Sequence, residues 1–72
     1  MHPDQPLTQY VPGRDTFSVS FRMGGVRRHH VGEISRPEPG HPARFMADEG
    51  LESQEVRTAA EALIPALIWP KR

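Results

Sequence analysis

The clearest structural signal in the chain is the run Thr16-Phe17-Ser18-Val19-Ser20-Phe21-Arg22. Its large apolar side chains alternate with polar ones, which is the two-residue period of a strand with one buried face. Phenylalanine, valine and threonine also suit the pleated surface of a sheet. The run therefore predicts a half-buried β-strand whose apolar side chains belong to the core.

A glycine pair follows this strand at once. Gly24-Gly25 can supply the positive backbone angles that a tight hairpin turn requires. We therefore expect residues 26–35 to return antiparallel to the first strand.

The length of the turn sets the register of this hairpin, and two registers are open. A two-residue turn sets Arg28 opposite Phe21. A three-residue turn with a bulge sets His29 opposite the same phenylalanine, and it also sets Val31 opposite Val19. We favour the second register because it gives the apolar face a better partner. The side chains at positions 28 and 30 then lie on the other face, beside those at 22 and 20.

Proline and glycine interrupt the chain after the hairpin. The segment 36–42 carries three prolines and one glycine, which rules out a ladder of backbone hydrogen bonds and predicts a loop. Residues 43–47 then predict a short third strand, with Phe45 as its core residue. We expect Asp48-Glu49-Gly50 to end that strand.

The C-terminal region predicts a helix. Apolar residues recur there at intervals of three and four, as on one stripe of a helix: Val56, Ala59, Ala60, Leu63 and Leu67. Two starts are open, because Ser53 can cap a longer helix and Thr58 begins a capping-box pattern for a shorter one. Pro65 lacks the backbone N–H and should end or kink the helix near Ile64.

The N-terminal residues 1–13 predict a flexible tail, because Pro3, Pro6 and Pro12 break regular structure. An alternative is an arm that docks Tyr10 and Val11 onto a partner. The predicted fold is thus α+β: a three-stranded antiparallel sheet packed by one C-terminal helix. It forms a single small domain over residues 14–72, preceded by the tail.

Size and composition restrict the function classes. The chain has 72 residues and no cysteine, which excludes a disulfide framework, thiolate metal ligands and a cysteine nucleophile. No stretch approaches the ~20 apolar residues of a membrane span, and the N-terminus lacks the pattern of a signal peptide. We expect a cytoplasmic protein, in the host bacterial cytoplasm if a phage encodes it.

The charge is unevenly distributed although the formal net charge is zero. Residues 14–44 carry six arginines against three acids, and residues 48–61 carry five acids against one arginine. Such asymmetry bears on partners rather than on fold. We predict polar partner contacts from the basic region, at Arg27, Arg28, His29 and Arg44. The same basic face could instead bind nucleic acid directly.

The sequence predicts neither catalysis nor a bound metal. His29 and His30 are adjacent, so in a strand they point to opposite faces and cannot easily chelate one ion. No serine or threonine lies in a nucleophile motif, and no glycine-rich phosphate loop joins a strand to a helix. We therefore expect a non-enzymatic protein without cofactor, metal or small-molecule ligand.

Large apolar residues crowd the C-terminus. Ile64, Leu67, Ile68 and Trp69 exceed what one helix stripe can bury against so small a sheet. Some of them either remain exposed as a protein-binding patch, with Trp69 as its anchor, or wrap the core of a small fold. Both interpretations stand at this point.

Two protein families resemble parts of this chain. The stretch from Gly50-Leu51 to Thr58-Ala59-Ala60-Glu61-Ala62-Leu63 resembles the end of HicB-type antitoxins, in which a short strand precedes a Thr-x-x-Glu-Ala-Leu helix start. It covers about the last third of the chain. This resemblance implies a small toxin as partner.

Over its whole length the chain resembles the small phage-encoded regulators of host RNA polymerase. The resemblance rests on chain length, the N-terminal MHPDQPLTQYVPG segment, the hairpin over residues 17–35 and the acidic helix. It implies a transcription regulator that binds the large subunits of bacterial RNA polymerase. It further implies inhibition of initiation through interference with the sigma factor, and antitermination.

Overall fold

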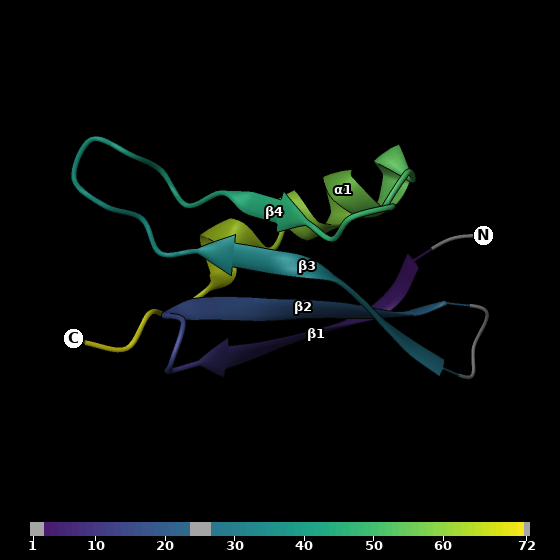
Figure 1. Cartoon of the computed structure of the whole chain (residues 1–72), viewed down its shortest axis with the longest axis horizontal. Helices are drawn as coiled ribbons and strands as arrows, with labels where there is room; N and C mark the ends of the chain where they lie inside the picture. The colour runs from purple at the N-terminus through teal and green to yellow at the C-terminus, as the bar shows by residue number, and fades with distance from the viewer. Residues whose placement is uncertain (1–2, 24–26, 72) are drawn as a thin grey trace.

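A computed structural model of the chain describes residues 3–23 and 27–71, with side chains for residues 6–22 and 27–71. The fold is α+β, an antiparallel meander in the order β1-β2-β3-β4 with one C-terminal helix (Figure 1). The elements are β1 (Pro3–Val11), β2 (Thr16–Met23), β3 (Arg27–Ser35), β4 (Phe45–Ala47), α1 (Gln54–Glu61) and a 3₁₀ turn, η1 (Ile64–Ala66). The predicted fold class is confirmed, but the sheet has four strands rather than three.

The additional strand is β1, in the segment predicted to be a flexible tail. Residues 3–11 pair antiparallel with β2, from Pro3 opposite Met23 to Val11 opposite Thr16. The prolines are accommodated because β1 is an edge strand, where a missing N–H need not leave a neighbour unpaired. The register also shifts between Asp4 and Leu7, so Pro6 lies at a bulge. The prediction that residues 1–13 lie outside the sheet is therefore wrong for residues 3–11.

The β2–β3 hairpin follows the favoured register near its turn only. Phe21 lies opposite His29, as the three-residue turn predicts, while Gly24 and Gly25 lie outside the described residues. Farther along, Val19 pairs with Gly32 and not with Val31, because β3 contains a bulge. Val31 and Ile34 are both buried although they are three residues apart. The extra residue of the bulge is what places both on the core face.

Gly32 at this bulge allows β4 to approach β3 closely. A Cβ atom at this position would lie 2.3 Å from the carbonyl oxygen of Met46 and 2.7 Å from the ring of Phe45. Strand β4 is shorter than predicted, with three residues, and pairs Gly32 with Ala47. Phe45 is half-buried and packs against the core, as expected.

Helix α1 uses the earlier of the two possible starts. Ser53 is the N-cap, and its hydroxyl accepts a hydrogen bond from the backbone N–H of Val56 at 3.2 Å. The alternative start at Thr58 is wrong, since that residue lies inside the helix. The helix ends at Glu61 and Pro65 lies in η1, which agrees with the expected effect of that proline.

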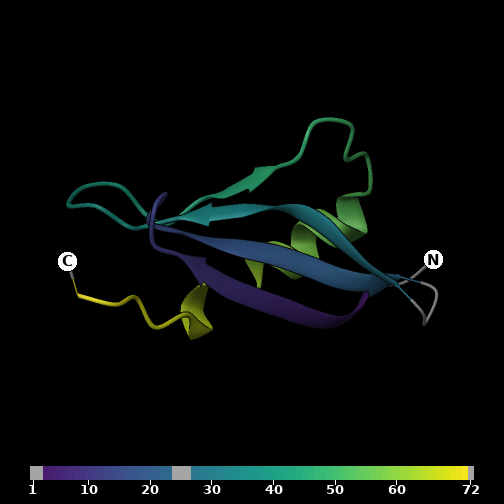
Figure 2. The same cartoon turned by 60° about the horizontal axis from the view of Figure 1, so that its bottom comes forward.

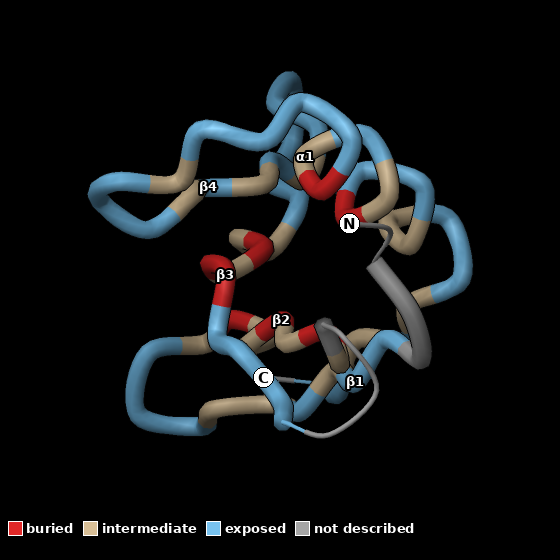
Figure 3. Tube along the Cα trace, turned by 90° about the vertical axis from the view of Figure 1, so that its right-hand side faces the viewer, coloured by how far each residue is buried: buried red, intermediate tan, exposed pale blue. Residues whose placement is uncertain are grey.

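The core lies between one face of the sheet and α1 (Figure 2). Its buried apolar side chains come from β2, β3 and α1, and Figure 3 shows these segments facing one another: Val19, Phe21, Val31, Ile34, Val56 and Ala60. The opposite face of the sheet is polar where β2 contributes Ser18, Ser20 and Arg22.

The C-terminal segment mainly wraps the core. Leu63, Ile64, Leu67 and Trp69 pack against it, and the Trp69 ring meets Phe17 edge-on at a centroid distance of 4.8 Å. Ile68 differs, because it is 88% exposed. Of the two interpretations of this apolar region, core wrapping describes most of it and exposure describes Ile68.

Candidate functional site

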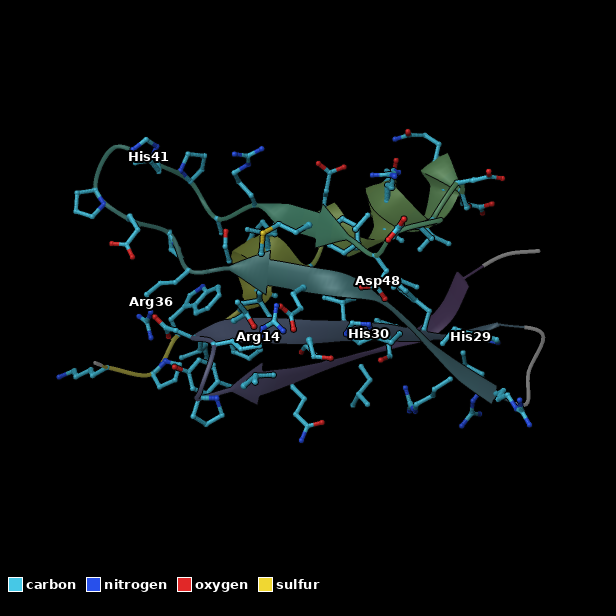
Figure 4. All side chains as sticks on the ribbon, viewed as in Figure 1. Arg14, His29, His30, Arg36, His41 and Asp48 are labelled. Carbon is cyan, nitrogen blue, oxygen red and sulfur yellow. The ribbon has the colours of Figure 1, made fainter. Side chains whose placement is uncertain are left out.

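Basic side chains gather where the β2–β3 hairpin approaches its turn. We define the hairpin end as Arg22, Arg27, Arg28, His29 and His30. The four β3 members are exposed and Arg22 is half-buried. Figures 1 and 4 show this part of the hairpin extending away from the loop formed by residues 36–44. The sequence prediction placed three of its partner-contact residues here.

Two arginines lie directly opposite each other in this hairpin end. Arg22 on β2 pairs with Arg28 on β3, so both side chains belong to the polar sheet face. Like charges in directly opposite positions destabilise a sheet. The Nε atom of Arg22 is in addition buried without a hydrogen-bond partner among the described residues. On the other side of β2, Asp4 of β1 lies opposite Arg22, so the register also places an acidic residue next to the pair.

His30 connects the hairpin end to the acidic part of the chain. Its Nδ1 lies 2.6 Å from Oδ2 of Asp48, just after β4, and Figure 4 shows the two side chains side by side. The backbone N–H of Asp48 also donates to the carbonyl oxygen of Val31 at 2.9 Å. Both side chains of the pair are nearly half exposed. The contact holds the loop after β4 against the root of the hairpin end.

The other predicted contact residues lie at the opposite end of the sheet. Tyr10 and Val11 end β1, where the Tyr10 hydroxyl donates to Asp15 at 2.5 Å. Arg44 is exposed beside Ser35 at the end of β3, and Trp69 covers Phe17 at the start of β2. The eight residues of β2 span about 23 Å between the two ends. The seven predicted residues therefore form two separate groups, one of them at the hairpin end.

His30 and Asp48, together with Ser20, lie in the order of a Ser-His-Asp acid–base relay. Ser20 lies opposite His30 across the sheet, and Asp48 contacts the Nδ1 side of the imidazole. Nucleophilic catalysis needs such groups to converge beside a site that excludes water. This pair is instead solvent-exposed on a sheet face. The geometry favours a hydrogen bond that positions the loop.

Within residues 3–23 and 27–71, no three His, Cys, Asp or Glu side chains are close enough together to hold a metal ion. The helices in that part of the chain are too short or too polar to cross a membrane.

Sequence reasoning missed the contribution of Asp48 to this site. The aspartate follows β4 in a segment assigned only the role of ending a strand, and it reaches His30 across 18 residues. No local pattern signals such a contact. Arg22 carried a signal, since its position in the alternating run placed it on the polar face.

Comparisons with known proteins give no identification. The chain has no significant match to a protein-family model, to a curated protein or to a solved structure.

Proposed function

We propose that the protein is a non-enzymatic transcription regulator that binds bacterial RNA polymerase through its hairpin end. In this proposal the hairpin end contacts an acidic surface on the large polymerase subunits. Binding inhibits initiation by interfering with the sigma factor and favours antitermination, as the resemblance to phage regulators implies. The protein acts stoichiometrically, by occupying a surface.

The observation that carries a binding role is the opposition of Arg22 and Arg28. The two guanidinium groups belong to one face of the sheet, so one anionic partner surface can meet both. Arginine is also suited to such contacts because its planar guanidinium forms paired hydrogen bonds with carboxylates and phosphates. Arg27 and His29 lie at the same end of β3, opposite Met23 and Phe21, and so belong to the other face of the sheet. An anionic partner surface therefore fits this end of the molecule.

The position of the hairpin end also suits a docking element. The core residues nearest to it, Phe21 and Val31, are buried, whereas Arg27 to His30 are exposed. Partner contacts can thus be made without disturbing the core. Substitutions there should change binding while the fold remains intact, which makes the proposal accessible to mutation.

The first test is an affinity pull-down from a nuclease-treated bacterial lysate, with retained proteins identified by mass spectrometry. We expect the large polymerase subunits to be recovered. The double variant Arg27→Ala with Arg28→Ala should lose them, while its thermal midpoint stays within a few degrees of the parent. In-vitro initiation and termination assays with purified polymerase would then measure the regulatory effect.

A matched control removes the same charge from the other end of the sheet. The double variant Arg14→Ala with Lys71→Ala should retain the polymerase. Equal loss in both double variants would mean that overall charge, and not the hairpin end, determines binding. Recovery of a small toxin in place of polymerase would favour the antitoxin alternative.

Direct nucleic-acid binding is the second candidate, and the basic residues of the hairpin end favour it. Arginine is the commonest residue for phosphate and guanine contacts. Such binding weakens steeply as salt concentration rises. Fluorescence anisotropy with a labelled duplex at several salt concentrations separates the candidates. A steep salt slope without any protein partner would favour nucleic acid.

A further inference from the structure

A cleft of about 430 Å³ lies at the end of the sheet opposite to the hairpin end. Its walls come from the β1–β2 turn, the end of β3 and the loop of residues 36–44. Figure 4 shows Arg14, Arg36 and His41 at this end of the molecule. The volume is typical of sites for small molecules or single side chains.

Two of the arginines in the cleft already have acidic partners. Arg36 donates from Nε to Asp15 at 2.7 Å, and this hydrogen bond is the main factor that raises the pKa of Arg36. Arg14 contacts Glu33 at 2.9 Å. These contacts hold the cleft walls in place. They also pair the charge of both arginines with acidic side chains of the protein itself.

Arg44 and His41 line the same cleft, as does the acidic residue Glu38. Both residues are exposed, and within the described part of the chain neither side chain has a hydrogen bond or an ion pair. Only their backbone groups are engaged. Arg44 bonds to Ser35 through its amide N–H and carbonyl oxygen, and His41 pairs with Glu38. The backbone is therefore held in place while the basic side chains remain available.

The cleft wall contains a further unsatisfied polar group. Thr16 is only 7% exposed, and its Oγ1 is buried without a hydrogen-bond partner among the described residues. Buried hydroxyl groups are nearly always paired in folded proteins, so an unpaired one calls for an explanation. A ligand oxygen entering the cleft could accept a hydrogen bond from this hydroxyl after a side-chain rotation.

We propose that this cleft binds the oxyanion of a small molecule, a carboxylate or a phosphate, through Arg44 and His41. The guanidinium of Arg44 supplies two parallel donors, and the imidazole of His41 supplies a third. The site is separate from the hairpin end and does not depend on the polymerase proposal.

The test uses amide chemical shifts of the ¹⁵N-labelled full chain. Sodium phosphate and sodium acetate are titrated separately, and sodium chloride at matched ionic strength is the reference. We expect saturable shifts at the amides of residues 14–16 and 35–44 with phosphate, acetate or both. Saturation with phosphate alone would assign a phosphorylated ligand, and saturation with acetate alone would assign a carboxylate. Shifts that equal those of chloride would overturn the proposal.

Variants then test which residues hold the anion. Arg44→Gln should weaken binding about tenfold, since a charge-assisted pair of hydrogen bonds is lost. The anion affinity of Arg44→Lys, which keeps the charge but lacks the planar guanidinium, should lie between that of the parent protein and that of Arg44→Gln. Arg28→Gln removes a charge at the far end and should leave binding unchanged. Saturable binding that survives Arg44→Gln would also refute the assignment.

The variant His41→Gln provides a second test of the site that remains valid if Arg44→Gln fails to fold. Position 41 is exposed in the loop, so this change should leave the thermal midpoint unaltered. We expect it to weaken binding severalfold. An unchanged affinity in a folded His41→Gln protein would remove the histidine from the site.

Discussion

The Nε atom of Arg36 donates a hydrogen bond to Oδ2 of Asp15 at 2.7 Å. The contact joins the β1–β2 turn to the segment that follows β3, across 21 residues. Asp15 also accepts from the Tyr10 hydroxyl, and Arg36 donates to the carbonyl oxygen of Pro70 at 2.5 Å. These two side chains therefore connect β1, the loop after β3 and the C-terminal segment at one point.

Replacing this carboxylate should destabilise the fold. Asp15 has a positive φ of 54°, which asparagine also tolerates, so Asp15→Asn tests the charge and not the backbone. The side chains of Asp15 and Arg36 are 29% and 15% exposed, so solvent screens the pair only in part. We expect a loss of about 1 kcal/mol in the free energy of unfolding, measured by urea denaturation.

The control for that prediction is Glu49→Gln, which removes one exposed carboxylate from the turn after β4. It should change the free energy of unfolding by less than about 0.5 kcal/mol. An equal loss in both variants would show that net charge matters more than the Asp15–Arg36 contact.

Trp69 should contribute to stability through the same region. Its ring packs edge-on against Phe17 and lies 5.3 Å from the guanidinium carbon of Arg36. Trp69→Ala removes both contacts and should cost about 2 kcal/mol, less than for a fully buried aromatic residue. Circular dichroism during thermal unfolding measures the effect. Ile68→Ala, at a position 88% exposed, should be nearly neutral, and a comparable loss there would contradict this account.

Gly32 should not tolerate a side chain. Gly32→Ala would place a Cβ 2.3 Å from the backbone oxygen of Met46, so β4 would have to move away from β3. We expect the free energy of unfolding to fall by at least about 2 kcal/mol, or the protein not to fold, because backbone atoms cannot shift without disturbing the strand. Gly13→Ala is the matched control, because no atom lies within 4 Å of a Cβ at that position. A well-folded Gly32→Ala protein with an unchanged unfolding midpoint would refute the close packing of β4.

The helix cap gives a further test. Ser53→Ala removes the acceptor for the Val56 N–H and should cost about 1 kcal/mol. Thr58→Ala, at the alternative cap position, loses only a 3.4 Å hydrogen bond from Gln54 on the helix surface. It should be neutral or slightly stabilising because alanine favours helix interiors. Chemical denaturation followed by Trp69 fluorescence compares the two variants. A larger loss at Thr58 than at Ser53 would contradict the helix start.

Local patterns in the sequence were sufficient to predict several secondary-structure elements of this protein. The alternation from Thr16 to Arg22 gave a half-buried strand, because the strand period follows from backbone geometry. The predicted helical stripe is confirmed at Val56, Ala59 and Ala60, whereas Leu63 and Leu67 lie beyond the end of α1. Proline and glycine likewise placed the loop over residues 36–42. Of the four basic residues predicted as contacts, Arg27, Arg28 and His29 stay together because they are adjacent on β3, whereas Arg44 lies at the other end of the sheet.

Tertiary structure decided the features that depend on distant residues. Prolines in residues 3–11 signal a break locally, yet these residues form a strand because β2 offers an edge whose pairing tolerates a missing N–H. The bulge at Val31-Gly32 arises because Ile34 must also be buried, and the approach of β4 requires a glycine there. The contacts of Asp48 with His30 and of Asp15 with Arg36, and the cleft that contains Arg44, depend on the same long-range pairing. Side chains 18 or 21 residues apart meet only once the sheet has formed, so no local pattern of the sequence encodes them.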